Sequence, residues 1–388
     1  MMQNVGKETV WAEINLDRLK GNLDFARGAL PAGTRIMAVV KANAYGHGAV
    51  EIAKYLERQG IDWLAVFSPE EGAELREHGV RTPILLLEYP GTEGLEKVIR
   101  YELTPALYDT DMARELSAAA CRAGCRVKTH VRVDTGCSGA GIQPDEAPSL
   151  LERIKDDEYL ECEGIFTHLN ASYGEQWKLA DNQVELFDQV ISNISGTGVL
   201  THAASSPALL RVSGSAYDMV RLGIMMYGIG CQNESVDPYI EPVMQLKACV
   251  SSINQVGSDS RIGYGWSVTT SGITTVASVG IGYSHALFLY FLKDGQVLVK
   301  GQRAPIIGRV AMNHLLVDIS HVEGVQPGDE VVIIGEQGLE SIKVAEIASQ
   351  AGIGRDNYDV VCLINNTIPR LYIENGRHRT ENISSNVG

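Results

Sequence analysis

A lysine between an apolar run and a glycine-rich turn is the residue best placed for covalent chemistry. Residues 36–40 are five consecutive apolar positions, typical of a strand buried on both faces. Lys41 follows directly, and a Gly-His-Gly turn then leads into a helix-like segment. A partly desolvated lysine at such a strand end loses its proton more easily and can form an imine with a carbonyl. On this evidence alone, a surface lysine after an edge strand remains an equal alternative.

The first 240 residues alternate between strand-like and helix-like segments, and we expect them to position Lys41. Alternation of this kind predicts parallel strands with right-handed crossovers. Eight repeats predict a closed (β/α)8 barrel, whose chemistry lies at the C-terminal ends of its strands. An open doubly wound sheet is the alternative, although no G-x-G-x-x-G motif opens an early helix. The predicted barrel strands are 36–40, 63–67, 84–87, 103–107, 127–133, 160–167, 199–202 and 219–222.

The pattern changes near residue 241, where helical periodicity fades. We therefore predict two domains, a barrel over 1–240 and a mostly β domain over 241–388. A short helix is expected at 344–350, and the polar tail after Tyr372 is expected to be disordered at its end. The predicted strands of the second domain are 244–253, 274–281, 296–299, 304–307, 315–319 and 330–334.

Composition limits the partners and the compartment. The 388 residues carry a net charge of -15, which argues against nucleic acid or an anionic membrane surface as partner. The N-terminus lacks the apolar core of a signal peptide, and no apolar run is long enough to span a bilayer. The seven cysteines are scattered, so we expect free thiols in a reducing cytoplasm and no metal site.

The stretch VVKANAYGHG around Lys41 resembles the cofactor-lysine signature of alanine racemases. The resemblance continues in the family's order through VDTG, THLNA, VRLGIMMYG, RIGYG and GRVAMNH and covers nearly the whole chain. It implies a fold-type III enzyme that carries pyridoxal phosphate (PLP) as an imine on Lys41. It also implies a set of residues around the phosphate, namely Tyr45, Ser206, Gly223, Ile224 and Tyr358.

The residue types in this set suit a phosphate. Backbone amides and hydroxyls at a helix start bind phosphate without excess charge. Ser206 before Pro207 predicts an N-cap and first helical residue, and Gly223 and Ile224 follow the eighth strand, where barrel enzymes often hold phosphate. Ser206 as a plain helix cap is the alternative, and capping is compatible with phosphate binding.

Arg221 ends the eighth predicted strand, and the resemblance implies that it faces the pyridine nitrogen of PLP. Arginine only donates hydrogen bonds, so that nitrogen would stay unprotonated. The ring would then be a weaker electron sink, which suits racemisation better than transamination. A structural salt bridge from Arg221 to Asp218 is the alternative.

Racemisation removes a proton from one face of the α-carbon and returns it on the other, so two bases are expected. Lys41 supplies one, and the resemblance implies Tyr264 as the second, with His168 as a partner that touches Arg221. A phenol with a pKa of roughly 10 needs neighbours that stabilise its phenolate. The resemblance also implies a head-to-tail homodimer with composite sites, in which Tyr264 and Met312 come from the neighbouring subunit and Tyr283 lines the substrate entrance.

The chain departs from the family pattern at four positions. Arg132 replaces the usual lysine, which is often carbamylated, and Gly139 replaces the arginine that it orients. We hypothesise that Arg132 takes over part of the substrate carboxylate contact. His285 and Asn313 replace two acidic residues near the entrance, which leaves the amino acid open between alanine and another small one such as serine.

The leading prediction is therefore a cytoplasmic PLP-dependent amino-acid racemase. A fold-type III decarboxylase is the nearest alternative, but it does not need Tyr264 in an RIGYG context. A non-catalytic PLP-binding relative is the alternative of another class, although such proteins resemble the barrel alone.

Overall fold

The computed structural model describes residues 8–170, 179–192, 198–230, 239–292, 294–353 and 357–379. Cys231 and the end of the polar tail lie outside this part of the chain. Two compact units are present. The barrel unit comprises Lys20–Ala44 and Ala49–Ile240, and the β unit comprises Met1–Leu19, Tyr45–Gly48 and Glu241–Gly388. The expected division at residue 240 differs from these units because the N-terminal segment and Tyr45–Gly48 group with the β unit.

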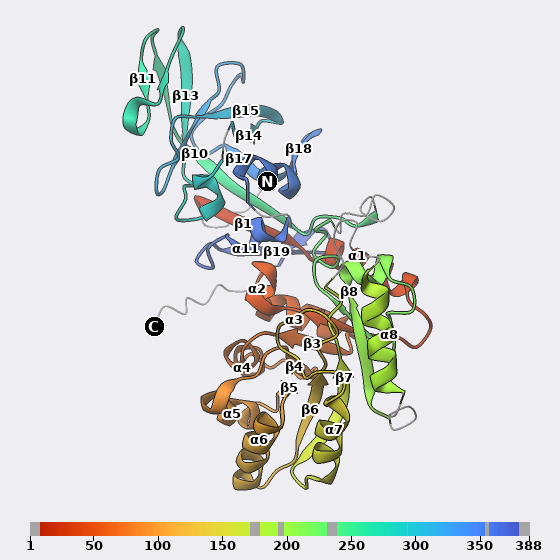
Figure 1. Cartoon of the computed structure of the whole chain (residues 1–388). Coiled ribbons are helices and arrows are strands. Elements are labelled where there is room, and N and C mark those ends of the chain that lie inside the picture. Colours follow the sequence, from red (N-terminus) through yellow and green to blue (C-terminus); the bar gives the residue numbers. More distant parts are fainter. Residues whose placement is uncertain are drawn as a thin grey trace. The chain divides into compact units, whose positions relative to one another are not determined.

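The barrel unit contains eight parallel strands that close on themselves, as predicted, with helices on their outside (Figure 1). All eight predicted runs become strands of this barrel. The strands are β2 (Arg35–Val39), β3 (Trp63–Val66), β4 (Ile84–Leu86), β5 (Thr104–Leu107), β6 (Val127–Arg132), β7 (Leu160–Phe166), β8 (Leu200–Ser205) and β9 (Met219–Leu222). The helices are α1 (Leu16–Ala29), α2 (Lys41–Tyr45), α3 (Ala49–Arg58), α4 (Pro69–Glu77), α5 (Gly91–Arg100), α6 (Thr110–Ala123), α7 (Ala147–Asp156), α8 (Ala180–Ile191) and α9 (Ser206–Arg211).

Burial and capping explain why these segments fold as they do. Strands β3, β4, β5 and β9 are buried at every position, as expected where helices cover one face of a barrel and side chains fill the other. Helix α4 starts with a full capping box, in which Ser68 and Glu71 satisfy each other's backbone amides. Helix α6 is capped by Asp109 and ends at Gly124, whose left-handed conformation suits glycine.

The β unit is built on a ten-stranded sheet in the order β18-β17-β14-β15-β16-β13-β10-β1-β19-β20. A further pairing of β17 with β10 closes six antiparallel strands into a ring. The strands are β1 (Val10–Asn15), β10 (Met244–Val256), β11 (Arg261–Ile262), β12 (Val268–Thr269), β13 (Thr274–Val279), β14 (Gln296–Val299), β15 (Gln302–Ile307), β16 (Leu315–Asp318), β17 (Glu330–Gln337), β18 (Glu340–Ile342), β19 (Arg370–Glu374) and β20 (Arg377–His378). The helical pieces are η3 (Tyr264–Trp266), η4 (Leu287–Tyr290), α10 (Val344–Ala351) and α11 (Tyr358–Cys362).

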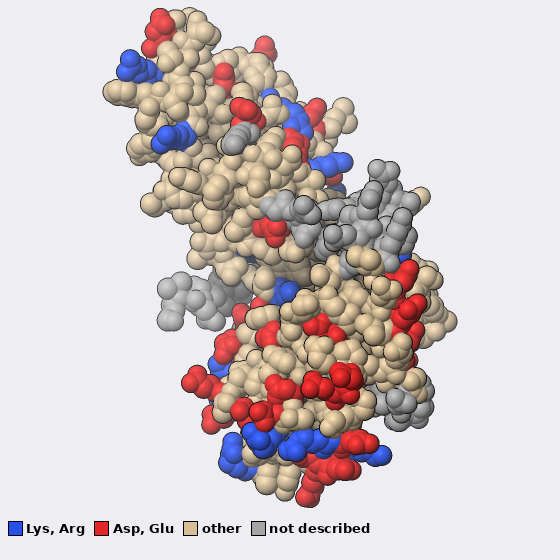
Figure 2. Space-filling model, in the orientation of Figure 1, with Lys and Arg blue, Asp and Glu red and all other residues tan. Residues whose placement is uncertain are grey.

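Two features of the β unit were not anticipated from the sequence. Strand β1 leaves the first domain and pairs with β10 and with β19. A two-stranded hairpin, β11 with β12, carries the short helix η3 and therefore Tyr264. On the face shown in Figure 2, acidic side chains are frequent on the barrel unit, together with basic ones at its lower end, while the β unit shows scattered side chains of both signs.

Candidate active site

Lys41 begins an unusual turn after β2. The next four residues, 42–45, all have positive φ angles between 52° and 54°. For L-residues this left-handed conformation costs about 1–2 kcal/mol per residue, so it persists only where the surroundings enforce it. Backbone strain of this kind is often found at functional sites, and here it directly follows the predicted imine lysine.

Side chains at both ends hold this turn within the barrel unit. Glu71, in the capping box of α4, accepts a hydrogen bond from the backbone N–H of Ala42 at 2.6 Å. The side chain of Asn43 accepts one from the N–H of Ala49, the first residue of α3, at 2.8 Å. Asn is among the few residues that tolerate the left-handed region. The direction in which Lys41 leaves β2 therefore depends on α3 and α4.

The predicted phosphate residues of the barrel unit meet at one place. Ser206 Oγ accepts hydrogen bonds from the N–H groups of Gly223 at 3.0 Å and Met225 at 3.4 Å, with Ile224 between them. The prediction that Ser206 caps α9 is wrong by one position. Ser205 is the N-cap, and its side chain makes no capping bond. The Ser206 hydroxyl does not cap the helix either, because it binds the backbone of the loop after β9.

Arg221 is buried inside the barrel, and its hydrogen-bond partners in the described part of the chain are uncharged groups. Its Nη2 donates to the carbonyl oxygens of Thr167 and Ala203, both at 2.8 Å, and its Nη1 donates to Nδ1 of His202 at 2.8 Å. The alternative of a salt bridge to Asp218 is wrong, since Asp218 accepts hydrogen bonds from a threonine of β8. Burial lowers the pKa of Arg221 to about 9, so it remains a cation at neutral pH. Among the described residues, its Nε–H has no partner and is available to an acceptor.

His168 lies next to Arg221, with its Nδ1 3.4 Å from Nη2 of the arginine. Desolvation by the surrounding protein, followed by the positive charges of Arg221, Arg132 and Lys41, lowers the pKa of this imidazole. His168 lies just after the end of β7 and is exposed to solvent. His168 is therefore neutral at physiological pH and lies within the electrostatic field of Lys41.

Arg132 ends β6 and projects a cation without a carboxylate partner. Its Nη1 donates to the carbonyl oxygen of Leu87 at 3.2 Å, and its guanidinium lies 6.0 Å from the ring centroid of Phe166. Within the described ranges, no carboxylate lies within ion-pair distance of this side chain. A Cβ added at Gly139 would meet nothing within 4 Å, so the position of the family's arginine is open space here.

Two predicted phosphate residues belong to the β unit. Tyr45 packs edge-on against Tyr358, the first residue of α11, with ring centroids 5.9 Å apart and an interplanar angle of 82°. The backbone that follows Tyr45 fits tightly, since a Cβ at Gly46 would lie 2.5 Å from the carbonyl oxygen of Val361. The structure thus brings these two tyrosines together through close backbone packing.

Tyr264 lies in η3 of the β unit and is 68% exposed. Its ring is 6.4 Å from that of His314. The glycines on either side, Gly263 and Gly265, have φ angles of 73° and 74°, which other residues rarely adopt. The RIGYG motif therefore works as a hairpin tip that presents an exposed tyrosine.

The predicted entrance residues of the β unit lie side by side. The N–H of Tyr283 donates to the carbonyl of Ala311, and the next residue donates to the carbonyl of Met312, which is 56% exposed. His285 Nδ1 accepts a hydrogen bond from the backbone of the same turn at 3.1 Å, and burial lowers its pKa. Asn313 donates to a serine hydroxyl of that turn. These two positions, acidic in the family pattern, are thus uncharged.

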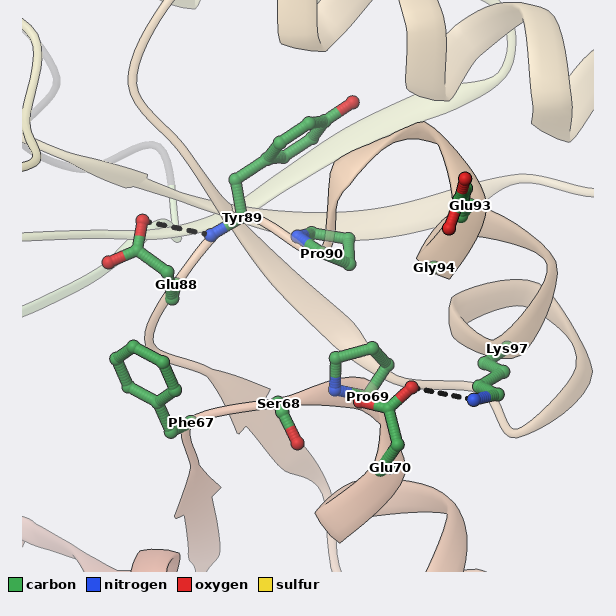
Figure 3. Close-up of a pocket in the computed structure, with 10 residues that line it drawn as sticks. All are labelled: Phe67, Ser68, Pro69, Glu70, Glu88, Tyr89, Pro90, Glu93, Gly94 and Lys97. Carbon is green, nitrogen blue, oxygen red and sulfur yellow. Dashed lines mark hydrogen bonds and ion pairs between the residues drawn. The ribbon is translucent and has the colours of Figure 1, made fainter.

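A cavity of about 420 Å³ lies between the segments that follow β3 and β4 (Figure 3). It is closed on one side by the ion pair of Glu70 with Lys97, at 2.6 Å. None of the predicted site residues lines it, so it is separate from the predicted cofactor site. Its lining consists of Phe67, Ser68, Pro69, Glu70, Glu88, Tyr89, Pro90, Glu93, Gly94 and Lys97.

The residues of the barrel unit fit PLP as a cofactor. Lys41 can form the covalent link, the hydroxyl and amides around Ser206 suit a phosphate, and Arg221 offers an unused donor where a pyridine nitrogen needs one. No group of three or more His, Cys, Asp or Glu side chains in the described part of the chain is arranged to hold a metal.

The residues that support this set were not identified from the sequence. Glu71 sits in a Ser-x-x-Glu pattern that signals a capping box, but the pattern says nothing of its bond to Ala42. His130 lies two residues before Arg132 on β6, and strand periodicity places both on one face. The pairing of that face with His202 and Phe166 depends on neighbouring strands.

A (β/α)8 barrel followed by a mostly β domain, together with the matches to known proteins, places the chain among the PLP-dependent amino-acid racemases, which are isomerases. Family models agree with this class along the chain. The model described as alanine racemase, N-terminal domain, matches residues 14–230, and the model described as alanine racemase, C-terminal domain, matches residues 243–372. The chain belongs to the alanine racemase family.

Individual relatives match over nearly their full length. The alanine racemase of Desulfovibrio desulfuricans is 35% identical over 369 residues, covering 94% of this chain and 98% of the relative. A solved alanine racemase of Clostridium difficile has a TM-score of 0.89 at 33% identity, covering 96% of this chain and 97% of that one. A solved alanine racemase of Bacillus anthracis with bound L-Ala-P has a TM-score of 0.88 at 30% identity and covers 97% of each chain. No helix in the described ranges has the length and apolar character needed to cross a membrane.

Proposed function

We propose that this protein interconverts the L and D forms of a small amino acid, alanine or serine, with PLP held at Lys41. The observation that carries the proposal is the convergence, in one barrel, of Lys41 on its strained turn and Arg221 with a free Nε–H donor. The cofactor, when bound, supplies the electron sink that makes the α-proton of the amino acid acidic. All other steps depend on the side chains of this chain.

Lys41 and Tyr264 are proposed as the two bases. Each would exchange a proton with one face of the α-carbon, so that removal on one side and return on the other inverts the centre. Tyr264 is suited to this role because it is exposed on a hairpin tip and can reach a ligand outside its own unit. His168, neutral and with its Nδ1 facing Arg221, is proposed to donate a hydrogen bond from Nε2–H to the oxygen of the tyrosine.

Arg132 is proposed to bind the substrate carboxylate. A guanidinium forms paired hydrogen bonds with a carboxylate, and this one lacks an acidic partner among the described residues. The open space at Gly139 leaves room for such a ligand or for movement of Arg132. With uncharged His285 and Asn313 near the predicted entrance, a neutral side chain such as methyl or hydroxymethyl is favoured.

The active form is proposed to be a head-to-tail homodimer in the cytoplasm, with Tyr264 and Met312 of one subunit completing the site of the other. The β unit exposes several large apolar side chains that an isolated unit would gain from covering. The exposed set includes Tyr264, Trp266, Leu287, Tyr290, Phe291 and Met312.

A chiral assay of the purified protein with PLP tests the proposal. L-alanine, L-serine and a panel of other amino acids are incubated, and D-product, keto acid, amine and carbon dioxide are measured. D-product from alanine or serine supports the racemase, and loss of that product in Tyr264→Phe supports the second base. Carbon dioxide release would instead identify the decarboxylase, and bound cofactor without any product would identify the non-catalytic relative.

A further inference from the structure

Two histidines form a buried chain behind Arg221 that the proposed reaction does not use directly. His202 Nδ1 lies 2.8 Å from Nη1 of Arg221, and His202 Nε2 lies 2.9 Å from Nδ1 of His130. Both imidazoles are fully buried within the barrel. The hydrogen-bond chain Arg221–His202–His130 therefore runs from β9 through β8 to β6. Neither histidine exposes a polar atom to water.

The donors and acceptors along this chain can be assigned without ambiguity. Arginine only donates, so Nδ1 of His202 must be an acceptor, and the proton of His202 must lie on Nε2. That N–H donates to His130, so Nδ1 of His130 is also an acceptor and its proton lies on Nε2. Neither ring can take a second proton while these bonds persist. Burial and the charge of Arg221 agree with this, because both lower the pKa of His130, to about 3.

His130 is the last residue of this hydrogen-bond chain, and its free nitrogen indicates its role. Its Nε2–H is buried and has no hydrogen-bond partner among the described residues. A core position that served packing alone would avoid such a donor, since an unpaired buried N–H is unfavourable. Among the residues that the structure describes, the one hydrogen bond of His130 is the one that its Nδ1 accepts from His202.

The His130 ring occupies the space that a side chain at the neighbouring position on β7 would fill, and that position is a glycine. Gly164 on β7 is paired with His130 on β6, and a Cβ at Gly164 would lie 2.5 Å from Cε1 of the imidazole. On the other side, the His202 ring stacks on Phe166 at 4.8 Å and 6°, and the Arg221 guanidinium lies 5.2 Å from the same phenyl ring. The three polar groups are thus held between strands with little freedom to rotate.

We infer that His130, with the space that Gly164 leaves for it, is a positioning residue: by accepting from Nε2–H of His202 it holds that ring with Nδ1 facing Arg221, and thereby helps to orient the arginine. The acceptor on His202 leaves Nη1 of Arg221 committed to the barrel wall, and the carbonyls of Thr167 and Ala203 commit Nη2 in the same way. The Nε–H and the second N–H of Nη1 then remain for a ligand. The relevance to catalysis rests on the proposed function, but the hydrogen-bond chain itself does not.

The chain is tested directly by nitrogen NMR of the full-length protein labelled with ¹⁵N-histidine. Long-range proton–nitrogen correlations report the tautomer of each ring, and single His130→Asn and His202→Asn variants assign the two signals. Both rings are expected as neutral Nε2–H tautomers that do not titrate between about pH 5.5 and 8. A proton on Nδ1 of either ring, or titration of either ring within that range, would overturn the inference even if the protein is an active racemase.

Two variants of His130 separate positioning from packing. His130→Leu fills the space but removes the acceptor, whereas His130→Asn places an amide oxygen near the position of Nδ1 and can still accept from His202. We expect His130→Leu to shift the His202 nitrogen signals and lower kcat about tenfold, and His130→Asn to recover most of both. Thr129→Val is the matched control, because Thr129 is the buried neighbour on β6 whose hydroxyl donates to the carbonyl of Glu161 instead.

Every outcome of these experiments either supports or refutes the positioning role of His130. A folded His130→Leu protein with unchanged His202 signals and unchanged pH profile would refute the positioning role. If His130→Leu does not fold, the tautomers of the unmodified protein and the His130→Asn variant still decide. If the protein shows no racemase activity, the nitrogen signals still establish or exclude the chain, so the two failures are distinguishable.

Discussion

Replacing Glu71 by alanine should loosen the strained turn after Lys41. Glu71 Oε1 accepts from Ala42 at 2.6 Å, while Oε2 accepts from the N–H of Phe67 at 2.7 Å and of Ser68 at 3.3 Å. One carboxylate therefore holds the turn that follows β2 and also caps α4, which follows β3. No other side chain in the described part of the chain bonds the N–H of Ala42.

The expected loss can be worked from these bonds. A hydrogen bond to a charged acceptor contributes about 1.5–3 kcal/mol when shielded and less at a partly exposed site such as this one. A lost capping interaction costs about 1 kcal/mol. Together these terms predict a decrease of roughly 2–3 kcal/mol in the free energy of unfolding. The part assigned to Ala42, about 1.4 kcal/mol, corresponds to a tenfold fall in kcat/KM if the turn must be formed for reaction.

Thermal unfolding and kinetic assays of three variants check this reasoning. Glu71→Ala should show both losses, and Glu71→Gln should keep an acceptor and lose less than half as much. Glu70→Ala is the matched control, because it removes only an exposed ion pair with Lys97 from the same helical turn and should have little effect. If Glu71→Ala resembles Glu70→Ala in both assays, the turn is held by other forces and the argument fails.

Three further predictions follow from other parts of the structure. Arg132→Ala should raise KM for the amino acid about 10- to 100-fold with a smaller effect on kcat, because a charged hydrogen-bond partner of the carboxylate is lost, and an unchanged KM in steady-state kinetics would contradict the proposed role. Burial lowers the pKa of His130 to about 3, whereas the unfolded chain has a pKa of about 6.5, so below pH 6.5 the unfolded state binds a proton that the folded state does not. The contribution of neutral His130 to the free energy of unfolding is therefore complete above about pH 6.5 and falls by about 1.4 kcal/mol per pH unit as the pH is lowered towards 3. Urea unfolding at several pH values should therefore show a shallower loss below pH 6 for His130→Asn than for the unmodified protein, and equal slopes would argue against a buried neutral imidazole. Gly48→Ala should destabilise the protein by about 2–4 kcal/mol, since its φ is 95° and the new Cβ would lie 1.9 Å from the hydroxyl oxygen of Tyr372. Adding Tyr372→Phe should recover part of the melting temperature, and no recovery would mean that φ alone sets the penalty.

The barrel was predictable because its strands are short apolar runs at regular spacing. Each run from β2 to β9 needs cover on both faces, and alternation with helices allows few other arrangements. The left-handed turn at 42–45 was not predictable in the same way. Of these four residues, only Asn43 is of a type that tolerates the left-handed conformation, and the hydrogen bonds that enforce it involve α3 and α4.

The domain organisation shows a similar limit. Residues 10–15 alternate in burial like a strand and precede a barrel, so the sequence favours placing them with the barrel. In the structure they pair with β10 and β19, which lie more than 200 residues later in the chain. Strand pairing over such separations depends on complementary edges that local periodicity does not describe.

By itself, the sequence determined the fold class and the residue types available for chemistry: a lysine after a buried strand, an arginine at the end of the eighth strand, and a tyrosine in a glycine-flanked turn. The tertiary structure decided how those groups are held. It showed that Arg221 has no carboxylate partner in the described part of the chain, that Ser206 bonds the loop after β9 rather than capping its own helix, and that two buried histidines lie behind the arginine. The reason is physical, since periodicity and motifs report local preferences, whereas hydrogen-bond direction and protonation depend on contacts between strands far apart in the chain.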